Sequence, residues 1–483
     1  MKYVIVIFSI TIIFFSCFQN KKVESSSMSH LNTLNMGEII GSAFYDSCYH
    51  MFYKKGISDV FVDQNGWGHA VSSDMLNWTE ISTISRPISK EFIINAHFSY
   101  DDKNNSKLSE NSEPVMIIIY IYFDEGEYQL GIMYSNDKGK TWNEKSSSLD
   151  IPNMAFQSTT CPFMYWNHTT KRWVMLLSTD NSIKFYTSPN LEDWEYMSDF
   201  ILKEEESEKE LLKSFQFFSM KIGSNEKWIL ISNMEKTEQP RSRYYIGDFD
   251  QGKYNVDNDY IKHLHVLDYG KDISFSMIND SILIGFSKMS VDYTSTPRKL
   301  NLISENNHFF LMTNPDYTNV FDSEKIITLD SLLINETHIL NIDALHNSPF
   351  DVLLNFDTSN QYAIHSAQKY GIVIQNEQNE TITIGYDNME RVLYVESQMT
   401  QEDNPNGFDK KRYSISYKIS EKTIVWHLII DKGIVECFID EGAISITDFF
   451  TKDIPIKSVY LYTDLGSIKL ISGSICKLEK QKK

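Results

Sequence analysis

The 483-residue chain has few cysteines, fewer basic than acidic residues and almost no helical periodicity. Its five cysteines include no closely spaced pair, which argues against a zinc site, and we expect neither a metal nor a cofactor. Lys and Arg number 45 against 65 Asp and Glu, so the net charge of −20 repels phosphate backbones and we expect no nucleic-acid partner. Because helix-period segments are almost absent, the chain is predicted to be all-β.

The later cysteines are interpreted as structural. Cys48 and Cys437 lie within apolar strand-like segments, where a free thiol packs as a small hydrophobic group. A disulfide between Cys437 and Cys476 is left open, because sequence spacing alone does not fix a pairing.

The N-terminus carries the one long apolar run, from Tyr3 to Phe15. This run is too short to span a bilayer comfortably and indicates a secretory signal. Its end resembles a bacterial lipoprotein processing site, which predicts a signal peptide over residues 1–17, lipidation of Cys17 and a polar tether over residues 18–30. The expected location is the cell envelope, with the lipid anchored in the outer membrane. An ordinary cleaved signal with an incidental cysteine is the alternative.

Three segments share one design, a strand that runs into an Asn or Asp turn and stops on a tryptophan. They are WGHAVSSDMLNW, YSNDKGKTW and YTSPNLEDW, and they end at Trp78, Trp142 and Trp194. These tryptophans fall 64 and 52 residues apart, a period typical of a β-propeller with one blade per repeat. We therefore expect the three tryptophans at equivalent places in successive blades. Three unrelated hairpins are the alternative.

The pattern changes after Pro315. The tryptophan repeats stop, and strands such as Ile424–Asp431 alternate with short turns, as in a β-sandwich. The sequence thus predicts a propeller over residues 31–320 and a sandwich over residues 321–483. One segment, Ile201–Phe215, is rich in charge and helix formers, and is interpreted as a short solvated helix or a flexible insertion.

The chain resembles glycoside hydrolase family 32, the invertases, levanases and inulinases that cleave fructosyl linkages. The resemblance is carried by the three tryptophan repeats, by PRKL at 297–300 and by LIIDKGIVECFID at 428–440. It implies a five-bladed β-propeller followed by a C-terminal β-sandwich, which agrees with the independent interpretation above. It also implies an oligosaccharide or polysaccharide ligand, fructan or levan among them.

The catalytic positions depart from the family pattern. Glu38 takes the place of the family's nucleophilic Asp, and Lys213 takes the place of its acid/base Glu. The Arg-Asp-Pro motif, whose Asp stabilises the transition state, falls on Thr160, Cys161 and a proline. Among the sugar-binding positions, Lys54 replaces a Gln, while Trp67 is retained. Phe92 matches a pocket Phe of the family, but the residue after it is Ile93 where the family has Ser.

Retaining glycoside hydrolysis needs two carboxyl groups about 5–5.5 Å apart, one to attack and one to protonate the leaving oxygen. The substitutions leave Glu38 alone, and we expect an ion pair between Glu38 and Lys213 to occupy the cavity. We therefore interpret the chain as a pseudoenzyme, a non-catalytic surface lipoprotein that binds fructan or another glycan. Two alternatives remain: an active glycosidase with rearranged catalysis, and a subunit of a glycan-uptake complex that binds no sugar. The first would use a nearby carboxylate, from Glu204, Glu205, Glu206, Glu208 or Glu210, a cluster otherwise interpreted as a solvated charged face.

Overall fold

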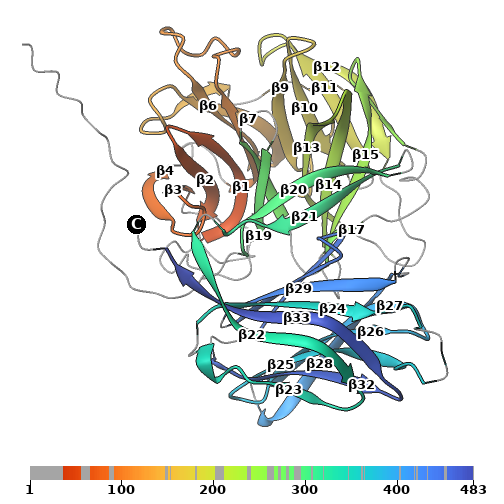
Figure 1. Ribbon diagram of the computed structural model, residues 1–483. Coiled ribbons are helices and arrows are strands. Elements are labelled where there is room, and N and C mark those ends of the chain that lie inside the picture. Colours follow the sequence, from red (N-terminus) through yellow and green to blue (C-terminus); the bar gives the residue numbers. More distant parts are fainter. Residues whose placement is uncertain are drawn as a thin grey trace, which may run out of the picture.

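The computed structural model describes most of the chain between residues 36 and 481 (Figure 1). The gaps in that range are 56–65, 86–91, 147–148, 150, 153, 180–181, 202–210, 236–240, 258–265, 270–272, 279–281, 288–294, 306–307, 319, 346–347, 361–362, 364, 402–403, 418, 420–421, 432 and 451–453. The predicted signal peptide, Cys17 and the tether lie outside the described residues, as does the acidic cluster of Glu204 to Glu210.

The N-terminal part is a β-propeller, and its described residues form five successive groups of four antiparallel strands (Figure 1). The first two groups are β1 (Met36–Tyr45), β2 (Cys48–Lys55), β3 (Trp67–Ser72), β4 (Thr79–Ile84), and β5 (Phe92–Asp101), β6 (Val115–Asp124), β7 (Glu127–Ser135), β8 (Asn143–Ser146). The third is β9 (Pro162–Asn167), β10 (Arg172–Ser178), β11 (Ser182–Ser188), β12 (Glu195–Ile201). The last two are β13 (Leu211–Ile222), β14 (Asn225–Glu235), β15 (Arg241–Asp250), β16 (Lys253–Val256), and β18 (Ile273–Ile278), β19 (Ile282–Ser287), β20 (Arg298–Glu305), β21 (His308–Pro315).

The tryptophan repeats occupy equivalent places, as predicted. Trp78, Trp142 and Trp194 each come immediately before the fourth strand of their group, β4, β8 and β12. The preceding turn is built the same way each time, because a serine hydroxyl and an Asp or Asn side chain bind each other and the backbone N–H groups that follow. The Ser–Asp or Ser–Asn pairs are Ser72 and Asp74 (3.0 Å), Ser135 and Asp137 (2.8 Å), and Ser188 and Asn190 (3.1 Å).

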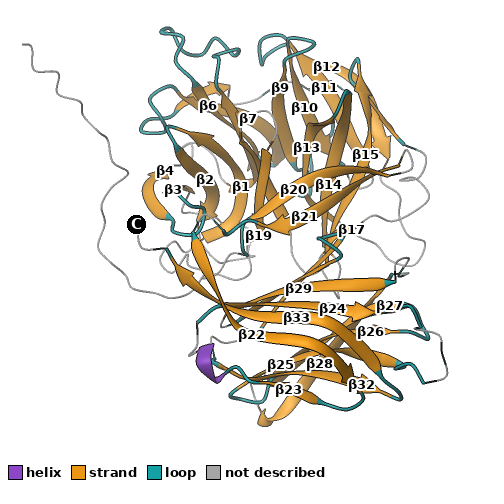
Figure 2. Ribbon diagram, viewed as in Figure 1, coloured by secondary structure: helices purple, strands orange, loops and turns teal. Residues whose placement is uncertain are grey.

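Of the two interpretations of Ile201–Phe215, the helix is wrong where the structure describes the segment, and the flexible insertion stays a prediction because residues 202–210 lie outside the described part of the chain. Residues 211–215 begin β13, which pairs with β14 from Leu211↔Glu235 onward. Leu212, Phe215 and Phe217 are buried there, so tertiary packing outweighs the helix propensity of the local sequence. Figure 2 shows how little helix the described chain contains; the helical element is one 3-10 turn, Asp343–Leu345.

The C-terminal part is a β-sandwich of two sheets, as predicted (Figure 1). One sheet orders its strands β31-β30-β29-β24-β33-β22, and the other β23-β32-β25-β26-β27-β28. A single apolar cluster, with Trp426 and Tyr370 fully buried in it, fills the space between the sheets. The strands are β22 (Phe321–Ile334), β23 (His338–Leu340), β24 (Phe350–Asp357), β25 (Lys369–Asn376), β26 (Thr381–Asp387), β27 (Val392–Gln401), β28 (Asn404–Ser416), β29 (Thr423–Asp431), β30 (Ile434–Ile439), β31 (Ile444–Phe449), β32 (Ile456–Asp464) and β33 (Ile468–Lys480).

Propeller and sandwich share one continuous sheet. Strand β17 (Val266–Tyr269) pairs with β15 on one side and, in parallel, with β31 of the sandwich on the other. Beside this seam Arg298 forms buried ion pairs with Asp268 and with Glu436, the latter at 2.7 Å, and hydroxyls of Ser445 and Thr447 complete the shell. We name Arg298, Asp268 and Glu436 the junction triad. It fixes the two domains to each other.

Two further predictions concern cysteines and membrane spans. Cys437 and Cys476 are separate thiols, so no disulfide joins them. Cys437 is fully buried in the sandwich core, as expected of a structural thiol. Within the described residues, no helix has the length and apolarity needed to cross a membrane.

Candidate functional site

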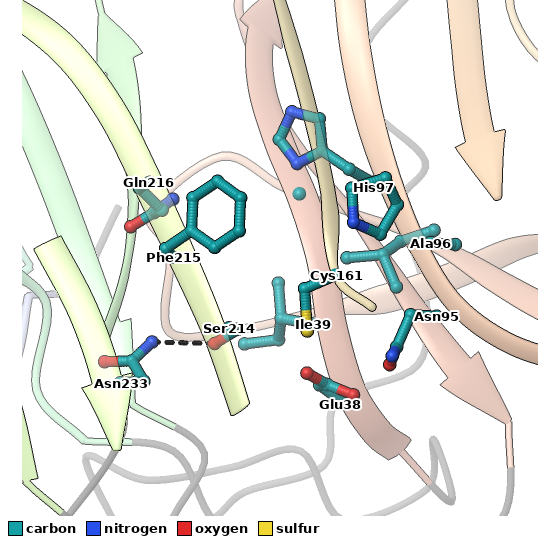
Figure 3. A pocket seen from close by; sticks show the side chains of 13 residues that line it. Glu38, Ile39, Asn95, Ala96, His97, Cys161, Ser214, Phe215, Gln216 and Asn233 are labelled. Atoms are coloured by element: carbon teal, nitrogen blue, oxygen red, sulfur yellow. Dashed lines mark hydrogen bonds between the residues drawn. The ribbon is translucent and has the colours of Figure 1, made fainter. Parts of the chain in front are cut away.

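A pocket opens where the first strands of four groups, β1, β5, β9 and β13, approach one another (Figure 3). The space between its walls measures about 480 Å³, counting the part that is open to solvent. The polar and titratable side chains on its wall are Glu38, Asn95, His97, Cys161, Ser214, Gln216 and Asn233, and the apolar ones are Ile39, Ile40, Ala96, Pro162 and Phe215. Two predicted positions, Glu38 and Cys161, are thus brought together in one cavity.

Irregular pairing aims these side chains at the cavity. Strand β1 shifts register on both sides of Ile39, β5 shifts between Ile93 and Asn95, and β13 shifts between Leu212 and Ser214. Each shift adds a residue on one strand, so a side chain that simple alternation would place on the opposite face is turned toward the axis.

Glu38 is held by Lys54. The lysine Nζ lies 2.8 Å from Glu38 Oε2, and it also donates to the backbone oxygen of Ile94 at 2.8 Å and to Asn95 Oδ1 at 3.3 Å. The pair is half-buried, with the Lys54 and Glu38 side chains 21% and 32% exposed. The sequence identifies Lys54 only as a replaced sugar-binding residue, and its role as the partner of Glu38 is not predictable from the motif.

The predicted Glu38–Lys213 ion pair stays a prediction. The Lys213 backbone belongs to β13, but its side chain lies outside the described residues. Its neighbour Ser214 lines the pocket and accepts a hydrogen bond from Asn233 Nδ2 at 2.9 Å (Figure 3). Gln216 binds the backbone of Phe275 through both ends of its amide, which ties the first strand of the fourth group, β13, to the first strand of the fifth, β18.

Cys161 occupies the position where the family resemblance implies a carboxylate. Its backbone N–H donates to Ser178 Oγ at 2.7 Å, and the residue is 6% exposed. Burial, followed by the negative charge of Glu38, raises the pKa of the thiol to about 12. The thiol is therefore neutral at physiological pH and supplies no charge to a reacting sugar.

The residues beside Cys161 are committed to structure. Thr160 is 1% exposed; its hydroxyl accepts the backbone N–H of Gln157 at 3.0 Å, and its backbone oxygen accepts from Asn95 Nδ2 at 2.9 Å. The ring of His97 lies 4.2 Å from that of Phe163, and burial lowers the pKa of His97 to about 3, which keeps the imidazole neutral.

The two predicted aromatic contacts fare differently. Trp67 is 2% exposed and packs on Tyr120 with ring centroids 5.9 Å apart, so it offers a ligand almost no surface in this structure. The backbone of Phe92 begins β5 and pairs with Phe123, while its side chain lies outside the described residues. Asn95, Ser214, Gln216 and Asn233 are not identified from the sequence. Asn95 and Ser214 directly follow register shifts, and Asn233 and Gln216 are placed by the pairing of β13 with β14, none of which the sequence pattern reveals.

The geometry supplies many hydrogen-bonding groups and little acid–base capacity. Of the described residues that line the pocket, Glu38 alone carries a carboxyl group, and that group forms an ion pair with the ammonium of Lys54. Two carboxyl groups at suitable separation are therefore not found among these residues. No cluster of three His, Cys, Asp or Glu side chains that could hold a metal ion occurs in the described part of the chain.

Comparison with known proteins agrees with this architecture. Residues 31–315 match the model for the glycosyl hydrolases family 32 N-terminal domain, and residues 320–475 match that for the family 32 C-terminal domain. The chain belongs to glycosyl hydrolases family 32.

Similar proteins include levanases and exo-inulinases. A levanase of Bacillus subtilis (strain 168) is 26% identical over 479 residues, which cover 92% of this chain and 69% of the relative. A levanbiose-producing levanase of the same organism is 23% identical and covers 88% of this chain and 85% of the relative. Among solved structures, exo-inulinase from Aspergillus awamori superposes with a TM-score of 0.77 at 18% identity, over 94% of this chain and 98% of that one.

Proposed function

We propose that this chain binds a saccharide at the propeller axis without hydrolysing it. One observation carries the proposal: the pocket's described wall holds a single carboxylate, Glu38, and that carboxylate is paired with Lys54. An ammonium group beside the nucleophile position opposes the positive charge that develops on the sugar during hydrolysis. A neutral thiol at Cys161 adds no compensating charge.

The proposed ligand is a neutral fructan or a related oligosaccharide. The family membership and the named levanase and exo-inulinase relatives support this class. The pocket offers amides and hydroxyls from Asn95, Ser214 and Asn233 beside an apolar wall, a combination suited to the hydroxyls and C–H faces of a sugar.

The test is a joint measurement of binding and turnover on the purified protein with levan, inulin and sucrose. Calorimetry is expected to detect binding to at least one of them, and product analysis is expected to detect no released fructose. The reversion variant E38D/T160R/C161D/K213E, which rebuilds the family's charged groups, is expected to gain measurable hydrolysis. Turnover by the unmodified protein that E38Q abolishes would overturn the proposal.

An active glycosidase is the second candidate, favoured by the carboxylate that Glu38 keeps at the nucleophile position in the pocket. It would recruit its acid from the cluster Glu204, Glu205, Glu206, Glu208 and Glu210. Replacing these five by Gln together separates the two functions, since only an active enzyme would lose turnover. A protein silent in both binding and hydrolysis would favour a subunit of a glycan-uptake complex instead.

We also propose that the protein is a lipid-anchored component of the cell envelope. The support is the sequence alone, an apolar run that ends at Cys17 and is followed by a polar tether. The variant C17S is expected to leave the membrane fraction and appear in the soluble one. Equal membrane retention of C17S and the parent would contradict the anchor.

A further inference from the structure

Lys54 has every one of its donors in use. An ammonium group has three N–H bonds, and those of Lys54 reach Glu38 Oε2, the Ile94 backbone oxygen and Asn95 Oδ1. A ligand in the pocket therefore finds no free donor on this lysine. Lys54 acts through its charge and through the position it gives Glu38, and it is a positioning residue.

The charge of Lys54 matters because, apart from Glu38, the described residues that line the pocket are uncharged. Glu38 is the charged side chain on the described wall, and His97, whose pKa burial lowers to about 3, is uncharged near neutrality. The Lys54 ammonium lies 2.8 Å from the Glu38 carboxylate, so at a sugar ring bound in the pocket its positive charge cancels much of the electric field of that carboxylate. A neutral ring, which binds through hydroxyls and C–H faces, is little affected by this cancellation.

We infer that Lys54 sets the charge selectivity of the pocket, so that it admits neutral sugar rings and discriminates against cationic ones. The inference rests on the proposed function for the identity of the ring. It goes further in assigning the discrimination to one residue. In the transition state of glycoside hydrolysis the sugar ring carries positive charge, so it resembles a cationic ring. The same lysine that disfavours a cationic ligand therefore also opposes the reaction.

The experiment compares two ligands of one ring size. One is a polyhydroxylated pyrrolidine that is protonated at neutral pH, and the other is 2,5-anhydro-D-mannitol, a neutral five-membered ring. Calorimetry measures both on the parent, on K54Q, on E38Q/K54Q and on K55Q. The K55Q variant is the matched control, because Lys55 is the next residue but pairs at 2.6 Å with Glu80, which does not line the pocket, whereas Glu38, the partner of Lys54, does. Thermal melting confirms that every variant is folded.

K54Q is expected to bind the pyrrolidine about tenfold more tightly than the parent, which corresponds to about 1.4 kcal/mol. This gain should disappear in E38Q/K54Q, since the carboxylate that attracts the cation is gone, and K55Q should match the parent. Affinity for the neutral ring should change less than about threefold, because its contacts are uncharged.

The outcomes separate this inference from the proposed function. If K54Q binds the pyrrolidine no better than the parent does, the charge role of Lys54 is wrong even when fructan binding is found. If the gain appears but the parent binds no saccharide, the charge role stands and the proposed function fails. A gain that survives in E38Q/K54Q would also overturn the inference, because it would not depend on Glu38.

Discussion

The pair Glu38–Lys54 and the junction triad place the same kinds of charged group in different surroundings. At the axis the two side chains are 32% and 21% exposed, and the pair borders a cavity. At the junction Arg298, Asp268 and Glu436 are 0%, 0% and 2% exposed, with hydroxyls filling the remaining positions. The sealed triad serves to hold two domains together, whereas the half-exposed pair at the axis costs little to remove, and its carboxylate, Glu38, lines the pocket.

The largest effect is expected at the junction. The variant R298M removes the cation and leaves Asp268 and Glu436 buried without a counter-charge, which should lower the free energy of unfolding by about 3–5 kcal/mol. Denaturant titration measures the loss. The matched control is R172M, because Arg172 pairs with Glu195 on the surface, where the side chains are 30% and 67% exposed. The control should lose less than about 1 kcal/mol; an equal loss in both variants would contradict the distinction.

An intermediate effect is expected at a buried pair that carries no charge, His50 and His69. Their ring nitrogens lie 2.9 Å apart, and burial lowers their pKa values to about 4 and about 3. The unfolded chain binds protons near pH 6.5 while the folded chain does not, so stability present above pH 6.5 is lost as the pH falls toward 4.

Each of these imidazoles is expected to contribute a slope of about 1.4 kcal/mol per pH unit in that window. Unfolding free energies between pH 7 and pH 4.5 measure it. The variant H69Q should reduce the slope by about a third, because His97, whose pKa burial also lowers to about 3, contributes to it as well, while H308Q, at an exposed position in β21, should leave it unchanged. A slope in H69Q equal to that of the parent would show that other groups cause the acid lability.

The smallest effect on stability is expected at the axis. The double variant E38Q/K54Q removes both charges of a half-exposed pair together, so neither is left without a partner, and unfolding should change by less than about 1 kcal/mol. Thermal melting at low and at high salt measures it. A loss comparable to that of R298M would mean that the axis pair, too, is primarily structural.

The fold could be predicted from sequence because its signals are local. The serine, the Asp or Asn two residues later and the closing tryptophan make their own turn, so Trp78, Trp142 and Trp194 marked equivalent positions before any tertiary contact was known. The candidate site was only partly predictable. Glu38 and Cys161 can be placed by counting along the family motifs, whereas Asn95 and Ser214 face the pocket because of register shifts. Residues 211–215 form part of strand β13 instead of a helix because they pair with β14, a contact that the local sequence does not reveal.

The shared sheet has a consequence for the order in which the chain is made. Asp268 of β17 meets Ser445 of β31, its partner 177 residues later. During synthesis from the N-terminus, that edge of β17 has no partner until the ribosome has produced the sandwich as far as β31, with β32 and β33 still to follow. A nascent propeller therefore emerges with one exposed strand edge and with the carboxylate of Asp268 still awaiting Ser445, Thr447 and the rest of its final surroundings. A strand of the second domain thus completes the first domain as well as its own.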